Sequence, residues 1–531
     1  MPTNKIPFRQ TNYFTDLICD YIDQKKELKV LYNRFPTLEN FEDQLKEKAK
    51  NFDDINRIVL ANVLKEQYTE LDISALTKKN IEALKKPNTY TITTGHQLNL
   101  FTGPLYFLYK IITTINLTAS LNKKYPDYNF VPIYWMASED HDFDEINYFN
   151  LNGKKLQWNK EAAGAVGRLD TVGLREVFKV LQNELGPGDN AKNLEQWFKD
   201  AYLQHNNLAD ATRFLANQLL GTLGLVILDA DHPKLKECFG PHIKTELLQQ
   251  TSFAKVNETN ETLESAGYNV QVNPREINLF YLKDNLRERI ELKNEHYHIV
   301  DTDISFSKEE FLKELASHPE RFSPNVILRP LYQEVILPNL CYIGGGGELA
   351  YWFQLKSTFS AHEVTFPILL LRNSVLIRNQ KQQKKLEKLN ITDADLFLKR
   401  DTFINKKVRQ ISNIDIDFSP QKEHLKTQFK DLFDLAEKTD KSFLGAVKAQ
   451  EVKQLNGLEH LEKRLLKAQK RKLADEIQRS TDLQEQLFPK QSLQERTLNF
   501  SQLYLEFGDE LINALVKEIK PLDLEFLLLT I

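Results

Sequence analysis

An acidic segment is the part of the chain whose side chains most directly suggest chemistry. Ser138-Glu139-Asp140-His141-Asp142 follows the apolar run 130–136 directly. Such a cluster can act as a general base, bind an amine or hold a hydrated Mg²⁺ ion. A solvated acidic loop is the simpler interpretation, but a position directly after an expected buried strand favours a site. We predict catalytic roles for Asp140, His141 and Asp142, and substrate binding by Ser138 and Glu139.

A second candidate segment lies between an expected strand at 89–94 and an expected helix at 105–117. A glycine at the end of a strand lets a ligand approach the backbone. The start of the next helix offers free N–H groups and a positive dipole end to an anion. An ordinary strand–helix turn is the alternative, and the pattern is neither a P-loop nor a GxGxxG fingerprint. We predict substrate or nucleotide binding by Thr94, Gly95, His96, Gln97, Thr102 and Gly103.

Four consecutive glycines form the third candidate. Such a run carries a high cost in backbone entropy, so it is expected where the backbone passes close to a ligand or needs positive φ. A flexible linker is the alternative, but linkers are rarely flanked by residues such as Leu340, Tyr342 and Trp352. We predict that a ligand contacts Gly344, Gly345, Gly346, Gly347 and Glu348, the last of which begins a helix.

Other side chains give weaker signals. Arg329 and Arg372 follow expected strands and could hold a carboxylate or a phosphate, although such arginines often pair with structural acids. The three cysteines, Cys19, Cys238 and Cys341, form neither a CxxC pair nor a Cys/His cluster. A zinc site built on thiolates is therefore not expected, and we assign no metal ligands.

The elements that must position these residues read as an α/β sheet. Strands are expected at 89–94, 130–136, 225–228, 326–328, 366–371 and 524–528. The first two, with the helix between them, form a βαβ unit. Ligands of open α/β sheets bind at the carboxyl ends of the strands, where the polar segments lie. The long intervals at about 150–206 and 233–323 are expected to be insertions.

The composition changes near residue 377. From about 378 to 486 the chain is rich in Lys, Glu, Gln and Leu, and 439–487 contains no proline. This pattern is typical of a coiled coil. We therefore divide the chain into a core at 1–376, a helical coiled-coil dimerisation domain at 377–487, and a segment at 488–531 that returns to the core. A homodimer is expected through 439–487, because its apolar stripe needs a partner.

The overall charge and the length of the apolar runs argue against two classes of partner, nucleic acids and membranes. The formal net charge is -4 and the pI about 6.3, so nucleic-acid binding is not expected. Apolar runs such as 367–371 are too short to span a bilayer, and membrane association is not expected. The first residues carry no apolar run, from which we expect no signal peptide and a cytoplasmic location.

Several segments together resemble one family. They are TTGHQLNLFTGPLYFLYK, PIYWMASEDHDFDEI, GGGGE, and LEKRLLKAQKRK followed by LFPKQSLQER. They occur in the expected order from about Thr93 to Arg496, so the resemblance covers most of the chain. The chain is similar in these motifs to the BshC family of bacillithiol-biosynthesis cysteine ligases.

The resemblance implies a Rossmann-like core similar to that of class I aminoacyl-tRNA synthetases, with connecting insertions and an α-helical coiled-coil domain that pairs two subunits. It implies a ligase that adds L-cysteine to the amine of glucosaminyl-malate, in the last step of bacillithiol biosynthesis. Residues 94–97 match the place of the synthetases' phosphate-binding histidine motif. The family often has glutamine where this chain has His96, and no KMSKS-like segment is present.

The expected chemistry agrees with this resemblance. Amide formation from a free carboxylate in water is uphill, so we expect ATP as the activating cosubstrate; a requirement for Mg²⁺ stays open. Three other classes of function were weighed: a tRNA-charging or tRNA-editing relative of the synthetases, a metal-assisted nucleotide hydrolase, and a non-enzymatic coiled-coil scaffold. The acidic net charge disfavours the first class, and the acidic and glycine segments disfavour the scaffold.

Overall fold

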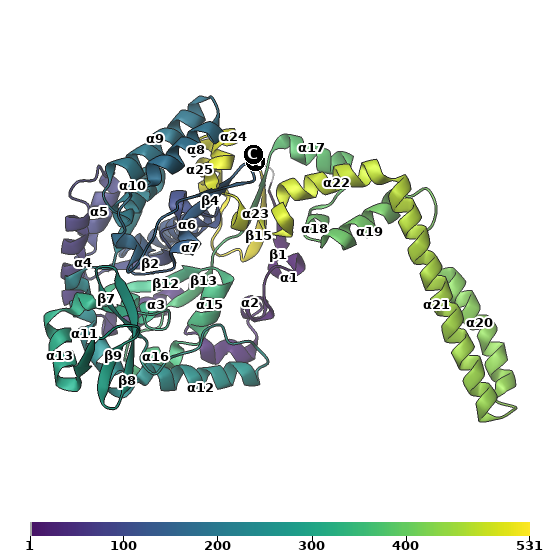
Figure 1. Cartoon of the computed structure of the whole chain (residues 1–531), viewed down its shortest axis with the longest axis horizontal. Helices are drawn as coiled ribbons and strands as arrows, with labels where there is room; N and C mark the ends of the chain where they lie inside the picture. The colour runs from purple at the N-terminus through teal and green to yellow at the C-terminus, as the bar shows by residue number, and fades with distance from the viewer. Residues whose placement is uncertain (1–2) are drawn as a thin grey trace. The chain divides into compact units, whose positions relative to one another are not determined.

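Five parallel strands in the order β13-β12-β2-β3-β6 form the central sheet (Figure 1). The computed structural model describes residues 3–531. These residues form two units, 3–377 with 494–531, and 378–493. The sheet belongs to the first unit, and its parallel order confirms the predicted α/β core. Its strands are β2 (Thr89–His96), β3 (Asn129–Met136), β6 (Val226–Asp229), β12 (Asn339–Gly344) and β13 (Ile368–Leu371).

The strand predictions succeed where the apolar run is continuous. Strands buried on both faces of a parallel sheet carry such runs, and β2, β3, β6 and β13 overlap the predicted segments. The strand predicted at 326–328 is wrong. These residues form a turn into helix α14 (Arg329–Ile336), whose first turn contains Pro330. Conversely, β12 lies at the centre of the sheet, although the sequence analysis assigned no strand there.

The register of the strands aligns their carboxyl ends. Ile343 of β12 lies opposite Thr94 of β2, and Gly95 lies opposite Trp135 of β3. Met136 lies opposite Asp229 of β6. The segments that follow β2, β3 and β12 therefore leave the sheet at one edge, the edge at which α/β folds bind ligands.

Apolar side chains on helices hold this sheet. Helix α6 (Tyr106–Lys124) connects β2 to β3 and packs on both, and most of its residues are buried. Helix α3 (Asn40–Asn51) packs against β12. Cys341 lies in the core with no exposed surface.

Two long insertions interrupt the α/β core. The first contains the hairpin β4 (Tyr148–Leu151) and β5 (Lys154–Gln157) and the helices α8 (Leu174–Leu185), α9 (Asp189–Gln204) and α10 (Leu208–Leu220). The second begins with α11 (Pro233–Gln249) and α12 (Thr251–Ser265) and includes α13 (Lys308–Ser317). It also carries an antiparallel sheet in the order β10-β9-β8-β7-β11. In that order, these strands are Ser305–Ser307, His296–Ile299, Leu286–Lys293, Leu279–Lys283 and Phe322–Pro324.

The last segment of the chain belongs to the first unit. After α24 (Phe500–Phe507) and α25 (Glu510–Glu518), strand β15 (Glu525–Thr530) pairs antiparallel with β1 (Thr3–Pro7). Strand β14 (Val375–Arg378) completes this three-stranded sheet. The segment is also attached by a buried ion pair, in which Arg372 donates to Glu495 at 2.6 Å.

The second unit is helical. Helices α20 (Ser419–Ala436) and α21 (Lys441–Lys472) lie side by side and pack through Phe429, Ala436 and Val447 (Figure 1). The single helical stretch predicted at 439–487 is interrupted at Leu473, where α21 ends before α22 (Ala474–Leu487) begins. Among the helices from residue 3 onwards, none combines the length and apolar character that crossing a membrane requires.

A buried ion pair beneath β12 gives a test of the fold. Lys48 of α3 donates to a Glu334 carboxylate oxygen at 3.1 Å, and both side chains are almost fully buried. Lys48→Ala leaves Glu334 without its cation, and we expect the free energy of unfolding to fall by about 3–5 kcal/mol. Urea unfolding followed by tryptophan fluorescence measures this change.

The double variant Lys48→Met, Glu334→Gln is the control, because it removes both charges together. Gln333 and Asn339, which donate to Glu334, can still donate to the amide oxygen. We expect this variant to recover most of the lost stability. A loss below about 1 kcal/mol for Lys48→Ala, the value of an exposed pair, would contradict the buried ion pair.

Candidate active site

A chamber of about 460 Å³ lies at the carboxyl edge of the parallel sheet. Gly95, Asp140 and Gly345 all line it, although they come from three distant segments. The prediction that these segments share one site agrees with this geometry. We call this cavity the main chamber.

A single carboxylate joins the elements around the main chamber. Glu348 of α15 (Gly346–Phe353) accepts hydrogen bonds from Lys110 at 2.8 Å, from the Tyr342 hydroxyl at 2.7 Å and from the Gly345 N–H at 2.8 Å. Lys110 also donates to the carbonyl of Gly95. Burial alone would raise the pKa of Glu348, but Lys110 and the other donors outweigh burial and hold this pKa below its usual value. The ends of β2 and β12 and the start of α15 are thus fixed to one ionised group.

The glycine run makes close packing possible. Gly344 ends β12 and Gly345 precedes α15, and none of the four glycines has a positive φ. A Cβ on Gly344 would lie 2.8 Å from Leu349 Cδ1. Gly345, Gly346 and Gly347 line the main chamber, and the first N–H groups of α15 have no carbonyl partner within the helix. This helix start can therefore receive an anion.

His96 lines the main chamber as a neutral group. Its ring is buried against Tyr106 and Phe107, with ring centroids 5.5 and 5.1 Å away. Burial, helped by Lys110, lowers the pKa of His96 to about 3. The imidazole forms a hydrogen bond to the backbone of Thr102, and its Nε2 has no partner in the described part of the chain. His96 can therefore offer polarity to a ligand but no positive charge at neutral pH.

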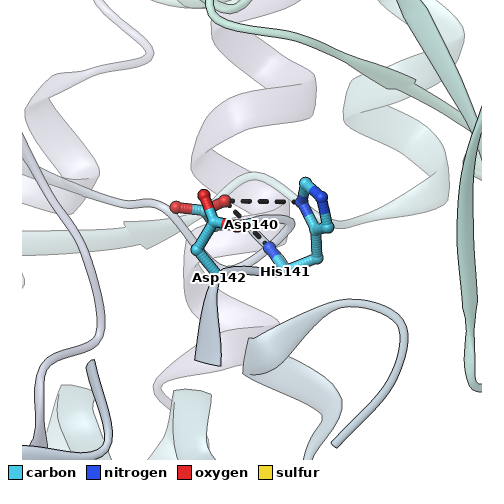
Figure 2. A group of neighbouring side chains, drawn as sticks. All are labelled: Asp140, His141 and Asp142. Atoms are coloured by element: carbon cyan, nitrogen blue, oxygen red, sulfur yellow. Dashed lines mark hydrogen bonds and ion pairs between the residues drawn. The ribbon is translucent and has the colours of Figure 1, made fainter. Parts of the chain in front are cut away.

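Asp140 is an ionised acid at the wall of the main chamber. Its carboxylate accepts hydrogen bonds from Gln97 at 3.0 Å and from the backbone N–H of His141 at 2.8 Å, and Nδ1 of His141 lies 3.7 Å from it. Figure 2 shows the two contacts with His141. Burial alone would raise the pKa of Asp140, but the His141 side chain, Gln97 and the His141 N–H outweigh burial and lower it to about 2. A carboxylate with so low a pKa is a weak base, so its charge is better suited to binding an amine as ammonium.

The first insertion holds the acidic loop in place. The N–H of Val166 donates to the carbonyl of Asp140 at 2.7 Å, and that of Gly167 donates to the carbonyl of Ser138 at 2.8 Å. A Cβ on Gly167 would lie 2.6 Å from the Ser138 Cβ, so this approach requires glycine. The Ser138 hydroxyl donates to Asp229, and Glu139 pairs with buried Lys236. Both side chains are therefore engaged in holding the loop.

Arg287, on β8 of the second insertion, determines what His141 can do. Its guanidinium lies 2.7 Å from Nδ1 of His141 and 3.9 Å from the ring centroid of Phe280. Because a guanidinium only donates, Nδ1 must accept and the ring proton must sit on Nε2. With its lone pair occupied, His141 is poorly suited to act as a general base.

The same contacts bear on metal binding. Asp140, His141 and Asp142 place possible ligand atoms within 4.8 Å of one another (Figure 2). Donors already occupy both Asp140 oxygens and Nδ1 of His141. A cationic guanidinium beside the imidazole makes this donor set a poor fit for a divalent cation, which disfavours a metal-assisted hydrolase.

Two smaller cavities adjoin the main chamber. The first, about 160 Å³, shares Trp135, Asp140 and Arg329 with it, and we call this cavity the side chamber. The second, about 290 Å³, shares Gln97, Tyr106 and Arg496 and is also lined by Gly103. Ligand pockets are typically of the combined size of such cavities, roughly 300–1,000 Å³.

Some predicted residues do not line the main chamber. Thr94 is fully buried and donates to the carbonyl of Ile343, and Thr102 is buried behind His96. Gly344 lies within β12. Ligand binding by these three residues is therefore not supported, and their roles are in packing. Ser138 and Glu139 line the side chamber instead, and neither His141 nor Asp142 lines the main chamber or its two neighbours.

The main chamber also contains residues that the sequence analysis missed. They are Tyr106, Lys110, Tyr342, Tyr351 and Arg496. Lys110 was detectable, because a lysine within the apolar run of α6 must find a buried partner. Its partner Glu348 lies more than 200 residues away in the sequence. The other four residues also come from segments far apart in the chain, so sequence spacing carried no signal for them.

A larger cavity lies elsewhere. It measures about 1170 Å³ and is lined by α4 (Asp54–Gln67), α11 and residues 362–365. Its wall includes Glu334 and Val335, which precede β12, so it is not at the carboxyl edge of the sheet. We therefore place the candidate active site in the smaller main chamber, where charged groups of both signs converge.

Comparison with known proteins identifies the family. Residues 1–373 match the N-terminal Rossmann-like domain of bacillithiol biosynthesis BshC, and residues 375–531 match its C-terminal coiled-coil domain. A protein of Flavobacterium johnsoniae named as a cysteine ligase, BshC, is 61% identical over the whole of both chains. Proteins of the same name from Cytophaga hutchinsonii and Bacillus mycoides are 40% and 27% identical, over 97% and 94% of this chain and 97% and 95% of their own.

The neutral state of His96 predicts how stability depends on pH. The folded-state pKa, about 3, lies below the ordinary value of 6.5, so the unfolded chain binds the extra proton between these values. The contribution of neutral His96 to the free energy of unfolding is fully present above pH 6.5. It is lost as the pH falls towards 3, by about 1.4 kcal/mol per pH unit. We expect the wild type to lose more stability than His96→Gln between pH 7.5 and 5.5, measured by urea unfolding. Parallel pH curves for the two proteins would show that His96 is not buried in the neutral form.

Proposed function

This chain belongs to the BshC family and is a ligase of bacillithiol biosynthesis, and we propose that it joins L-cysteine to the amine of glucosaminyl-malate in the last step of that pathway. The observation that carries this proposal is the charge distribution of the main chamber. The lining of this chamber includes the cations Lys110, Arg329 and Arg372 and the carboxylate of Asp140. A substrate with both malate carboxylates and a sugar amine requires groups of both signs.

The cations are available to a substrate to different degrees. Arg372 is held by Glu495, and Lys110 is held by Glu348. Arg329 donates only to the side chains of Gln333 and Tyr351 among the hydrogen bonds of the described residues. Arg496 is exposed at the rim. An anionic substrate would therefore find Arg329 and Arg496 the least neutralised.

Activation of the cysteine carboxylate is the energetic requirement of this reaction, and we propose ATP as its source. The free N–H groups at the start of α15, which line the main chamber, would hold phosphate oxygens. Bound ATP would convert the carboxylate into an acyl group with a good leaving group. We assign no metal to the acidic loop, for the reasons of geometry given above.

Proton removal from the incoming amine is the second requirement. Burial and the neighbouring charge of Asp140 raise the pKa of Asp142, which makes Asp142 the stronger base of the two aspartates. Its carboxylate, a carboxylate oxygen of Asp140 and a ring nitrogen of His141 lie within 4.8 Å of one another, so Asp142 is next to the Asp140 wall of the main chamber. We propose that Asp142 accepts the proton of the sugar amine as the amide bond forms, a role worth roughly 100- to 10,000-fold in rate.

We also propose that the protein forms a homodimer through its second unit. Packing of α20 on α21 leaves a set of large apolar side chains at least one-third exposed: Leu432, Leu435, Phe443, Leu444, Val452 and Leu461. Apolar surfaces of this kind commonly mark interfaces. A second copy of the same helices would cover them.

Product formation tests the ligase reaction. The pure protein is incubated with cysteine, glucosaminyl-malate and ATP, and bacillithiol is sought by mass spectrometry. A parallel reaction with total tRNA tests charging. Bacillithiol that depends on all three small molecules is the expected result, and charged tRNA without bacillithiol would contradict the proposal.

Asp140→Asn is expected to lower turnover more than His96→Gln. Removing a charged partner of an amine costs about 1.5–3 kcal/mol, or roughly 10- to 100-fold in rate. Glutamine at position 96 keeps a neutral polar group, so a loss of only several-fold is expected. Bacillithiol formation is measured at saturating and then at limiting substrate, and circular dichroism checks folding. Abolished activity in His96→Gln with near-normal Asp140→Asn would reverse the two assignments.

The dimer predicts a mass by light scattering at micromolar concentration of twice that of the chain. Val452→Glu places a charge in the proposed interface and is expected to shift the mass towards that of the monomer. Lys453→Glu, the same new side chain at an adjacent polar position, is the control and should remain dimeric. A monomeric wild type would refute the interface.

A further inference from the structure

The side chamber has the size of one small molecule. At about 160 Å³, it is comparable to the cavity of roughly 150 Å³ that accommodates benzene, a molecule of about the bulk of cysteine. Its walls combine the apolar Met136, Pro324 and Val326 with the polar Ser138, Glu139, Arg287 and Asn325, and it shares Trp135 with the main chamber. A small side chain would fill this space.

A cation lies where the two chambers meet. The guanidinium of Arg329 is surrounded by the rings of Trp135, Tyr342 and Trp352, whose centroids are 5.8, 5.6 and 5.9 Å away. Among the described residues, no aspartate or glutamate forms an ion pair with it; its partners are neutral oxygens of Gln333 and Tyr351. A desolvated guanidinium without a counter-ion favours binding of a carboxylate or phosphate.

An anion lies at the same junction. The Asp140 side chain is about one-quarter exposed and lines both chambers. It receives hydrogen bonds from Gln97 and the backbone N–H of His141, and Nδ1 of His141 lies 3.7 Å from it, but no lysine or arginine of the described residues is within ion-pair distance of it. The nearby Arg287 donates to His141 instead. The carboxylate charge is therefore available to an ammonium group.

We propose that the side chamber binds the cysteine substrate as a zwitterion, with its carboxylate on Arg329, its ammonium on Asp140 and its thiol against Met136, Pro324 and Val326. This assignment rests on the proposed function and specifies which part of the site takes the amino acid. It leaves the main chamber for glucosaminyl-malate and the activating cosubstrate.

The position of Arg329 explains how the two substrates would meet. A Cβ on Gly95 would lie 3.9 Å from Nη1 of Arg329, so the bound carboxylate would sit beside the Gly95 backbone. The start of α15 lines the same chamber. The carbon to be activated is thus held at the mouth of the side chamber, facing the space from which the sugar amine arrives.

Truncated ligands test the two charge contacts without relying on catalysis. Isothermal titration calorimetry compares cysteine with cysteamine, which lacks the carboxylate, and with 3-mercaptopropionate, which lacks the ammonium. The wild type should prefer cysteine to both by at least ten-fold. In Arg329→Gln, cysteine and cysteamine should bind with nearly equal affinity, because the contact to the carboxylate is lost. Cysteine should still bind more tightly than 3-mercaptopropionate. Asp140→Asn should show the opposite pattern.

Matched controls are available for both substitutions. Arg175→Gln changes an exposed arginine of α8, and Asp144→Asn changes an exposed aspartate of the same acidic loop. Both controls should keep the wild-type preferences. Equal weakening of cysteine and cysteamine in Arg329→Gln would overturn the carboxylate assignment.

The outcomes separate this inference from the proposed function. An enzyme that makes bacillithiol but keeps its ligand preferences in both variants has its cysteine elsewhere, which overturns the inference alone. Cysteine binding with the predicted preferences, but no bacillithiol from the complete reaction, overturns the proposed function and leaves an amino-acid site. Absence of cysteine binding in an active wild type also overturns the inference.

Discussion

The ionised carboxylate of Glu348 is the interaction on which the candidate site depends. Its side chain is half-buried, and its partners Lys110, Tyr342 and the Gly345 N–H come from α6, β12 and the turn into α15. Removing one partner from such a group leaves an uncompensated charge, so the elements can only move together. Because Lys110 also holds the carbonyl of Gly95, the end of β2 belongs to the same rigid assembly.

Around this fixed centre, the insertions supply what the parallel sheet lacks. The sheet register brings Gly95, the acidic loop and the glycine run to one edge. The first insertion then fixes the acidic loop through Val166 and Gly167, and the second contributes Arg287. The site is therefore built by the segments at the ends of the strands, by the first insertion and by the second insertion. Functional groups commonly lie on such loops over a rigid scaffold.

The elements of the fold and the site that could be predicted from sequence are those determined by residues adjacent in the chain. Continuous apolar runs revealed β2, β3, β6 and β13, and polar residues directly after two of these strands revealed the chamber edge. Strand β12 was missed because its glycine-rich end suggested a loop, and only pairing with β2 and β13 stabilises it. The break at Leu473 carries no glycine or proline signal. The roles of His141 and Arg329 depend on neighbours remote in sequence, which no spacing pattern encodes.

The pairing of β1 with β15 has a consequence for how the chain folds during synthesis. Residues 3–7 pair as a strand with residues 525–529, and Arg372 forms its ion pair with Glu495. At elongation rates of roughly 5–20 residues per second, the first strand waits on the order of a minute for the second to emerge from the ribosome. Meanwhile it presents an unpaired edge, the kind of surface that recruits wrong partners. Nascent chains of this protein should therefore depend on chaperones until the last strand is made, and removal of residues 525–530 should leave an aggregation-prone core even though no group of the main chamber is lost.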